Sequence, residues 1–368
     1  MDRQTRRVLV ALATSLGALT ACSSDSATAP RAAGFLGGTA NNAQIGLVVN
    51  STGQSLTLFQ LGDTTQRRQV PFGASTLITP TTLSVRAHLA AVPLGDAASV
   101  ALVDLDAASV KRTFLFANGN ATGSAFYDDT TVFVANYLGN YIGRVTVRQA
   151  TDSIRDTVRV TATPGTIVAS NSRILVLSQN LNTAGDYSPL GNSVVTAIDP
   201  ITLTVLGSVG TGGTNAQDAT MGIDGKLYVL NTGPCCSTAS SLAIINPTTL
   251  QVEATIPNVG PYAGSIHIDR NGLAYISGFF FGTTVLDTKT RQFVRGPDNP
   301  ICAKLPDGTC RGAFDATAAA NGDLYQVFFG SPKQNLAPYI FVFHAGTFAL
   351  ADSISAGAGP SAIEVRTF

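Results

Sequence analysis

Tryptophan is absent from this 368-residue chain, and charged residues are scarce. They make up 12% of the sequence, against about 25% in an average soluble protein. Only two glutamates (Glu253 and Glu364) and five lysines are present, whereas aspartate, glycine and threonine are common. Because glutamate and lysine are good helix formers and the abundant residues favour strands and turns, the composition predicts an all-β protein.

Other absences exclude classes of function. After the first 21 residues, no basic run is longer than the two residues of Arg67-Arg68, which argues against a nucleic-acid partner. The three histidines lack the spacing to acids or cysteines that a zinc site needs. No G-x-S-x-G motif is present, and the glycine-rich pieces do not open a helix that could hold a phosphate. We therefore expect no metal and no cofactor.

The N-terminus has the pattern of a bacterial lipoprotein signal. Three arginines in the first seven residues precede the apolar run Val8–Leu19, and Leu19-Thr20-Ala21-Cys22 follows. This order predicts a signal peptide over residues 1–21 and a lipid on Cys22. The alternatives are an ordinary signal peptide with an incidental cysteine and an uncleaved membrane helix, although an apolar run of twelve residues falls short of the roughly 20 that span a bilayer.

Residues 22–43 are rich in serine, alanine, threonine and proline and show no apolar periodicity, so we expect a flexible tether. Ser23, rather than aspartate, follows Cys22. By resemblance to the enterobacterial sorting rule, this places the lipid-anchored protein in the outer membrane of the cell envelope, facing the periplasm or the cell surface.

A repeated unit extends over residues 44–368. Five apolar runs end in a polar residue and a turn, most clearly in AIDPITLTVLGSVG (197–210) and IINPTTLQVEATIPNVG (244–260). A strand, a tight turn and a second strand precede this unit, as in MGIDGKLYVLN (221–231), where Asp224-Gly225 suits a two-residue hairpin. Together the two units predict a four-stranded meander, A to D from the centre outward, that recurs about every 45 residues, the size of a β-propeller blade.

Six complete copies are visible, with second strands near Leu89, Val132, Ile174, Leu227, Leu273 and Leu324. The two ends of the repeat region supply a seventh. The tail at 360–365 reads as a lone inner strand, and residues 45–50, 55–61 and 67–73 read as the other three. We therefore expect a seven-bladed β-propeller whose first blade is closed by the N-terminal strands and the C-terminal strand, which hides two sheet edges. Six or eight blades are the alternatives.

The I-D-P-x-T-x-x-V turn at 198–205, followed by DGKLYVLN at 224–231, resembles the YncE-like, YVTN-repeat seven-bladed propellers. The resemblance is best over residues 195–290 and covers nearly all of the chain after the tether. It implies the propeller fold, but the family as a whole has no single activity. Propellers that bind pyrroloquinoline quinone and BamB-like lipoproteins repeat a tryptophan in each blade, so the absence of tryptophan argues against that class.

Few residues offer chemistry. Inner strands line the channel of a propeller, and His267, Asp315 and Glu364 are the candidates for its wall, although a packed or solvated structural histidine is the alternative for His267. His344 occupies the polar turn position of its repeat, where it would cap the turn, and His88 has no acid or cysteine nearby in the sequence.

Four cysteines follow the tether. An exported protein meets an oxidising compartment, so we expect disulfides. Cys302 and Cys310 flank a short loop and are the preferred pair, while Cys235 and Cys236 could form a vicinal disulfide. Cross-pairing between the two sets is the alternative.

Four long loops fall on one face of the expected ring, over neighbouring blades four to seven: 180–192, 232–240, 296–312 and 330–338. The opposite face is expected to keep short turns. Because function concentrates on loops held by a rigid scaffold, we expect a recognition surface there that includes Asn180, Asn182 and Tyr187. The sequence thus favours a non-enzymatic, membrane-anchored binding module for a protein, peptide or glycan. The alternatives are a hydrolase or lactonase-like propeller with a channel-centred site and a purely structural surface protein.

Overall fold

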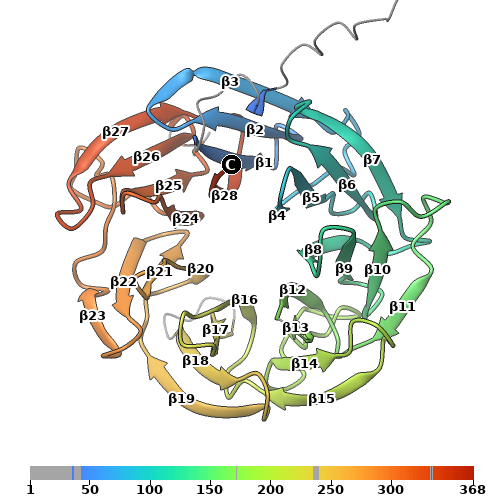
Figure 1. Ribbon diagram of the computed structural model, residues 1–368. Coiled ribbons are helices and arrows are strands. Elements are labelled where there is room, and N and C mark those ends of the chain that lie inside the picture. Colours follow the sequence, from blue (N-terminus) through green and yellow to red (C-terminus); the bar gives the residue numbers. More distant parts are fainter. Residues whose placement is uncertain (1–34, 37–42, 171, 235–239, 332, 334) are drawn as a thin grey trace, which may run out of the picture. The chain divides into compact units, whose positions relative to one another are not determined.

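The computed structural model describes residues 35–36, 43–170, 172–234, 240–331, 333 and 335–368. The expectations for the signal peptide, Cys22, Cys235 and Cys236 lie outside these residues, as does most of the expected tether. In the part that is described, all regular structure longer than one turn is β-strand, in seven four-stranded antiparallel sheets. Figure 1 shows these sheets arranged as the blades of a ring, which confirms the all-β, seven-bladed β-propeller.

Each blade is given with its innermost strand first. Blade one contains β28 (Pro360–Thr367), β1 (Gln44–Asn50), β2 (Ser55–Gln60) and β3 (Asp63–Pro71); blade two contains β4 (Ser84–Arg86), β5 (Leu89–Pro93), β6 (Ser99–Asp104) and β7 (Ser109–Leu115); blade three contains β8 (Ala121–Phe126), β9 (Thr131–Asn136), β10 (Tyr141–Thr146) and β11 (Asp156–Arg159).

The remaining blades follow the same order. Blade four contains β12 (Pro164–Ala169), β13 (Ile174–Ser178), β14 (Val194–Ile198) and β15 (Val205–Gly210); blade five contains β16 (Ala216–Met221), β17 (Leu227–Asn231), β18 (Ser241–Asn246) and β19 (Gln251–Pro257); blade six contains β20 (Ala263–Ile268), β21 (Leu273–Gly278), β22 (Gly282–Asp287) and β23 (Gln292–Arg295); blade seven contains β24 (Asp315–Ala318), β25 (Leu324–Phe328), β26 (Tyr339–Phe343) and β27 (Leu350–Ser355).

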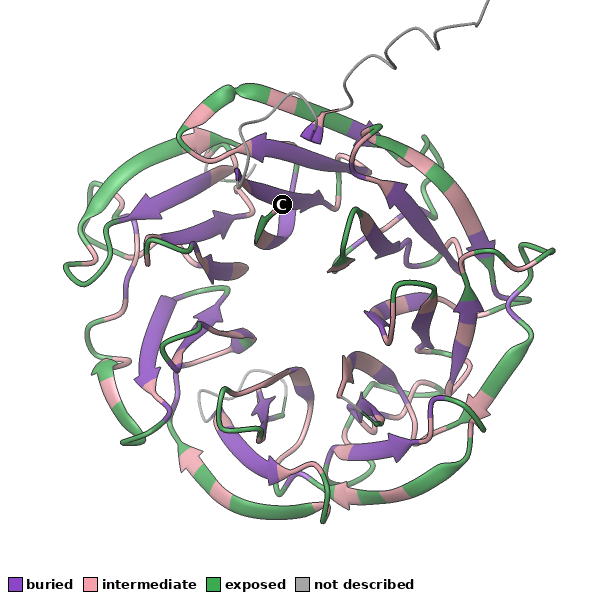
Figure 2. Cartoon of the chain, in the orientation of Figure 1, coloured by how far each residue is buried: buried purple, intermediate pink, exposed green. Residues whose placement is uncertain are grey.

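The second and third strands of each blade form the core. Figure 2 shows burial concentrated in these strands, whereas the outer strands carry many exposed residues. A strand buried on both faces reads as a continuous apolar run, and LYVLN in β17 is buried throughout. Neighbouring blades pack through these runs: Leu230 and Ile244 of blade five share a cluster with Ile276 and Leu286 of blade six. The core therefore lies between blades.

Blade one is closed as the sequence predicted. β28 pairs antiparallel with β1, with Ile363 opposite Val48, and β1 continues into β2 and β3. The pairing satisfies the backbone groups on the facing edges of the two strands, so β1 is not left as an unpaired edge.

The repeated polar residue at the third-strand turn acts as a cap. The side chain of Asp199 accepts hydrogen bonds from the backbone N–H groups of Ile201 and Thr202, both at 2.8 Å. Asn246 and Asp287 accept the equivalent pairs in blades five and six. These turn bonds explain why the repeat needs aspartate or asparagine at this position.

Two histidine expectations differ from the structure. The imidazole of His344 lies 3.8 Å from the Asp323 carboxylate in the first hairpin of its own blade, so its side chain contacts an acid of another turn. His88 has an acid beside it after all, because the turn of blade two brings the Asp106 carboxylate to 2.9 Å from Nδ1. Both contacts join turns that are distant in sequence but adjacent at one end of a blade.

The disulfide between Cys302 and Cys310 is present and confirms the preferred pairing. It closes a loop in which the backbone N–H of Leu305 donates to Thr309 and Asp307 accepts from Thr309. By the loop-entropy estimate, a bridge of this span contributes about 2–3 kcal/mol.

The four long loops join the strands that the sequence assigned to them, and so emerge on one face of the ring. The opposite face does not have short turns throughout, because residues 147–155 form a long connection between β10 and β11. Arg112 holds this connection by donating to the Gln149 carbonyl and the Asp152 carboxylate. No helix in the described part of the chain is long and apolar enough to cross a membrane.

Candidate functional site

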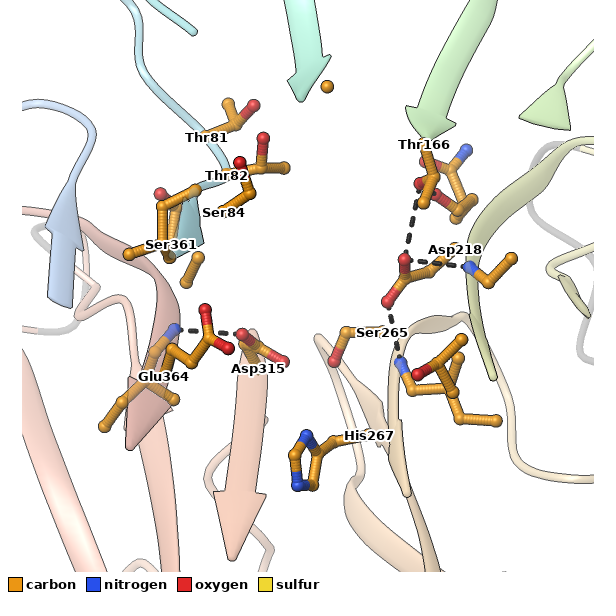
Figure 3. Close-up of a pocket in the computed structure, with 18 of the residues that line it drawn as sticks. Thr81, Thr82, Ser84, Thr166, Asp218, Ser265, His267, Asp315, Ser361 and Glu364 are labelled. Carbon is orange, nitrogen blue, oxygen red and sulfur yellow. Dashed lines mark hydrogen bonds between the residues drawn. The ribbon is translucent and has the colours of Figure 1, made fainter. Parts of the chain in front are cut away.

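The innermost strands of all seven blades line a central cavity of about 1010 Å³. Figure 3 shows hydroxyl groups around much of its wall, including those of Thr82, Ser84, Thr166, Ser265 and Ser361. Most of the polar side chains in the wall are therefore neutral, with a few titratable groups set among them.

His267, Asp315 and Glu364 all line this cavity, from β20, β24 and β28 respectively. A fourth titratable residue, Asp218 in β16, lies on the wall with them (Figure 3). Sequence reasoning missed Asp218. The sequence feature that could have identified Asp218 is its place on the predicted inner strand of blade five.

Asp218 and Asp315 perform the same local role. One oxygen of Asp218 accepts the backbone N–H of Ile266 in blade six at 3.0 Å, and one oxygen of Asp315 accepts the N–H of Ile363 in blade one at 2.9 Å. Each carboxyl thus joins its own blade to the next blade around the ring. Asp218 also accepts the hydroxyl of Thr166 from blade four, at 3.3 Å.

Burial controls the protonation of both groups. It raises the pKa of Asp218 to about 6, against the lowering effect of its hydrogen bonds. It raises the pKa of Asp315 to about 7, and the negative charge of Asp218 adds to the rise. Each is therefore far more protonated at neutral pH than an ordinary aspartate.

Glu364, His267 and Arg366 occupy the adjoining part of the wall. Burial raises the pKa of Glu364, while its ion pair with Arg366 opposes the rise. Burial lowers the pKa of His267 to about 4, assisted by the Arg366 charge, so the imidazole is neutral at physiological pH. The Thr317 hydroxyl lies 3.4 Å from Nε2 of that ring.

These groups offer proton donors and acceptors but no metal cage. Within the described residues, no group of three or more histidine, cysteine or acidic side chains is placed to hold a metal ion. The channel wall can hydrogen-bond a polar ligand through its hydroxyls and its protonated carboxyls.

A second cavity of about 550 Å³ lies where the loops of blades six and seven meet. Its lining is dominated by five phenylalanines, with Arg311 and two leucines: Phe279, Phe280, Phe314, Phe328, Phe329, Leu305 and Leu336. We call it the phenylalanine pocket. Phe279, Phe314 and Phe329 also line the central cavity, so the pocket adjoins the mouth of the channel.

The phenylalanines form a continuous row of ring contacts. Phe280 packs on Phe279 with ring centroids 4.6 Å apart, Phe279 on Phe314 at 5.2 Å, and Phe314 on Phe329 at 5.2 Å. Phe280 is nevertheless 65% exposed and Phe279 43%. Large apolar side chains held in position yet open to water are typical of a contact surface.

The local sequence explains this exposure. Phe279, Phe280 and Phe281 follow Gly278 and precede Gly282 in the tight turn between β21 and β22. Only Phe281 turns into the core, at 8% exposed. Three consecutive phenylalanines at a turn were a visible signal, because a turn of this length cannot bury all of them.

Asn180, Asn182 and Tyr187 lie in the loop between β13 and β14, and none of them lines either cavity. The Asn180 amide donates to the Asn192 carbonyl at 3.1 Å, and the Asn182 N–H donates to Ser188, so both brace the loop. Tyr187 is 51% exposed. Their role in recognition stays a prediction.

Comparison with known proteins supports the fold and nothing finer. No family model matches the chain, and no curated protein matches its sequence. Among solved structures, Kuenenia stuttgartiensis hydrazine synthase matches with a TM-score of 0.61 at 13% identity, over 79% of this chain and 90% of that one. The computationally designed Ika8 protein matches with a TM-score of 0.58 at 10% identity, over 88% and 87%.

Proposed function

We propose that this chain is a YncE-like, YVTN-repeat propeller, tethered to the bacterial cell envelope by a lipid on Cys22, and that it acts as a binding module for a protein or peptide. The outer membrane, facing the periplasm or the cell surface, is the proposed location. The lipoprotein pattern at residues 1–22 supports the anchor, and the repeat motif supports the family.

One observation carries the binding role: the phenylalanine pocket opens beside the channel mouth on the face that bears the long loops. Exposed aromatic anchors in a pocket are characteristic of binding hot spots. A glycan fits less well, because the pocket offers few polar side chains to hydrogen-bond the hydroxyls of a sugar.

A pull-down from detergent-solubilised envelope tests this function. Wild-type protein should retain specific partners, and Phe279→Ala with Phe280→Ala should lose them. Ile201→Ala is the matched control, because Ile201 is 69% exposed but lies in the turn between β14 and β15 on the opposite face. Equal retention by all three proteins, or none by the wild type, contradicts the proposal.

The channel-centred hydrolase has one observation in its favour. Asp315 has a pKa of about 7, which suits a general acid at neutral pH, and it lines the same cavity as His267 and Glu364. The hydrogen bond from Ile363 gives Asp315 a structural task as well, and the binding module remains the better supported function.

A further inference from the structure

Arg311 has an unusual environment in the phenylalanine pocket. Its guanidinium lies over the rings of Phe328 and Phe341, at 5.5 Å from each centroid. Its Nε is buried without a hydrogen-bond partner, and no described acid pairs with the group. Buried polar groups in proteins are nearly always hydrogen-bonded, so this exception requires an explanation.

All the charged side chains that line the pocket are positive. Arg311 and Lys333 line it, and no aspartate or glutamate does. The rings of Phe328 and Phe341 hold the guanidinium in place, and its N–H donors are left for a planar anion. A carboxylate is the planar anion that arginine binds with two parallel hydrogen bonds. Apart from Thr309 and Ser331, the remaining lining has no polar side chain, so the pocket fits a carboxylate that carries an apolar group.

The adjoining channel indicates what kind of molecule carries that carboxylate. The pocket of about 550 Å³ shares Phe279, Phe314 and Phe329 with the cavity of about 1010 Å³, whose wall is lined by hydroxyls. A small free acid would fill only the pocket. A polypeptide end would fill both, with its last side chain among the phenylalanines and its preceding backbone against the polar channel wall.

We propose that the phenylalanine pocket binds a polypeptide C-terminus whose last residue is apolar, with the terminal carboxylate on Arg311. The inference rests on the proposed binding function and specifies its ligand. C-terminal carboxylates are a recurrent recognition element in peptide-binding domains.

Fluorescence anisotropy with a labelled hexapeptide, Gly-Ser-Gly-Ser-Leu-Phe, tests the proposal. The free acid should bind the wild type, and the C-terminal amide of the same peptide should bind about 10- to 100-fold more weakly, because a hydrogen-bonded charge is lost. The amide arm requires no substitution, so it is independent of whether a variant folds.

Arg311→Gln should reduce binding of the free acid to the level of the amide and leave the amide unchanged. The matched control is Arg295→Gln, because the Arg295 guanidinium also lies over a phenylalanine ring, 5.7 Å from Phe348, but does not line the pocket. The control variant should bind the free acid as the wild type does.

Equal binding of acid and amide, or no binding of either to the wild type, overturns the inference. If the pull-down still depends on Phe279 and Phe280 in that case, the binding function stands and only the chain-end ligand is wrong. Decanoate is the competitor for a free acid: displacement of the peptide at decanoate concentrations below the peptide's own Kd assigns the pocket to small carboxylic acids and also overturns the inference.

Discussion

Blades two, three and four are joined at the inner ring by threonine hydroxyls that donate to backbone carbonyls, whereas the joints from blade five to six and from blade seven to one are made by carboxyl groups. Thr82 donates to the Thr122 carbonyl, and Thr122 donates to the Pro164 carbonyl. Between blades four and five the two kinds meet, because the Thr166 hydroxyl is shared by the Gln217 carbonyl and the Asp218 carboxyl. Asp218 and Asp315 instead accept backbone N–H groups.

Both kinds of joint connect a side chain to the backbone of another blade, but they respond differently to pH. A hydroxyl is neutral at every physiological pH. A buried carboxyl is stabilised in its neutral form and is penalised when it ionises. One part of the ring should therefore weaken as the pH rises, while the other part should not.

The largest expected effect is on the pH dependence of stability. The folded-state pKa values of Asp218 and Asp315, about 6 and about 7, lie above the ordinary 3.8. The folded state therefore holds more protons, and the contribution of these groups to stability falls as the pH rises from about 4 to about 7.

The double variant Asp218→Asn, Asp315→Asn removes this loss. The free energy of unfolding of the double variant, relative to that of the wild type, should rise by about 2–4 kcal/mol from pH 5 to pH 8.5. The rise is smaller than about 1.4 kcal/mol for each unit of pKa shift, because channel water screens the charges. Urea unfolding at both pH values measures the gain. His267 affects stability in the opposite direction, because its pKa is lowered in the folded protein. Its contribution to the free energy of unfolding falls as the pH drops from about 6.5 to about 4.

Comparing two proteins that both keep His267 and Glu364 cancels the contributions of those groups. A constant difference between wild type and double variant across the pH range would show that the two aspartates ionise normally in the folded protein.

A smaller effect is expected from deleting the acid joint at blade one. Asp315→Ala leaves the N–H of Ile363, a residue 4% exposed, without its partner, which should cost about 1–3 kcal/mol. Urea unfolding at pH 5 is the appropriate measurement, because there the wild-type acid is protonated and carries no charge penalty. Asp315→Asn is the control, since its amide oxygen can still accept; an equal loss in both variants would assign the effect to something other than this bond.

The smallest effect is expected at a hydroxyl joint. Thr122→Val keeps the shape of the side chain and removes the donor to the Pro164 carbonyl, for a loss of about 0.5–1.5 kcal/mol. The loss should be the same at pH 5 and pH 8.5. A pH-dependent loss would contradict the division of the ring into a neutral and an acidic part.

The fold was largely predictable because each repeat contains the apolar strands and the turn residues that a blade needs. Each second strand is an apolar run buried between blades. Asp224-Gly225 and Asn271-Gly272 make the first hairpins of blades five and six, so β17 and β21 begin at the predicted Leu227 and Leu273. The partners of His88 and His344 were not predictable, because both ion pairs join turns that only the folded blade brings together.

The site was less predictable for a specific reason. A strand shows alternate residues to opposite faces, but the register shifts between Ala216 and Asp218 in β16 and between Ala263 and Ser265 in β20. One such shift reverses which residues face the channel, and so alternation along the sequence does not identify Asp218 as a wall residue. Loop lengths indicated the face of the ring, but the pocket depends on which loops meet, and Phe279 lies in one of the shortest.

Closure of blade one has a consequence for biosynthesis. β1 is among the first strands to leave the ribosome, yet its inner partner β28 ends at Thr367, more than 300 residues later. Six blades can form while β1 still presents an unpaired edge, so this edge stays open to wrong strand pairing until the C-terminal strand has been made.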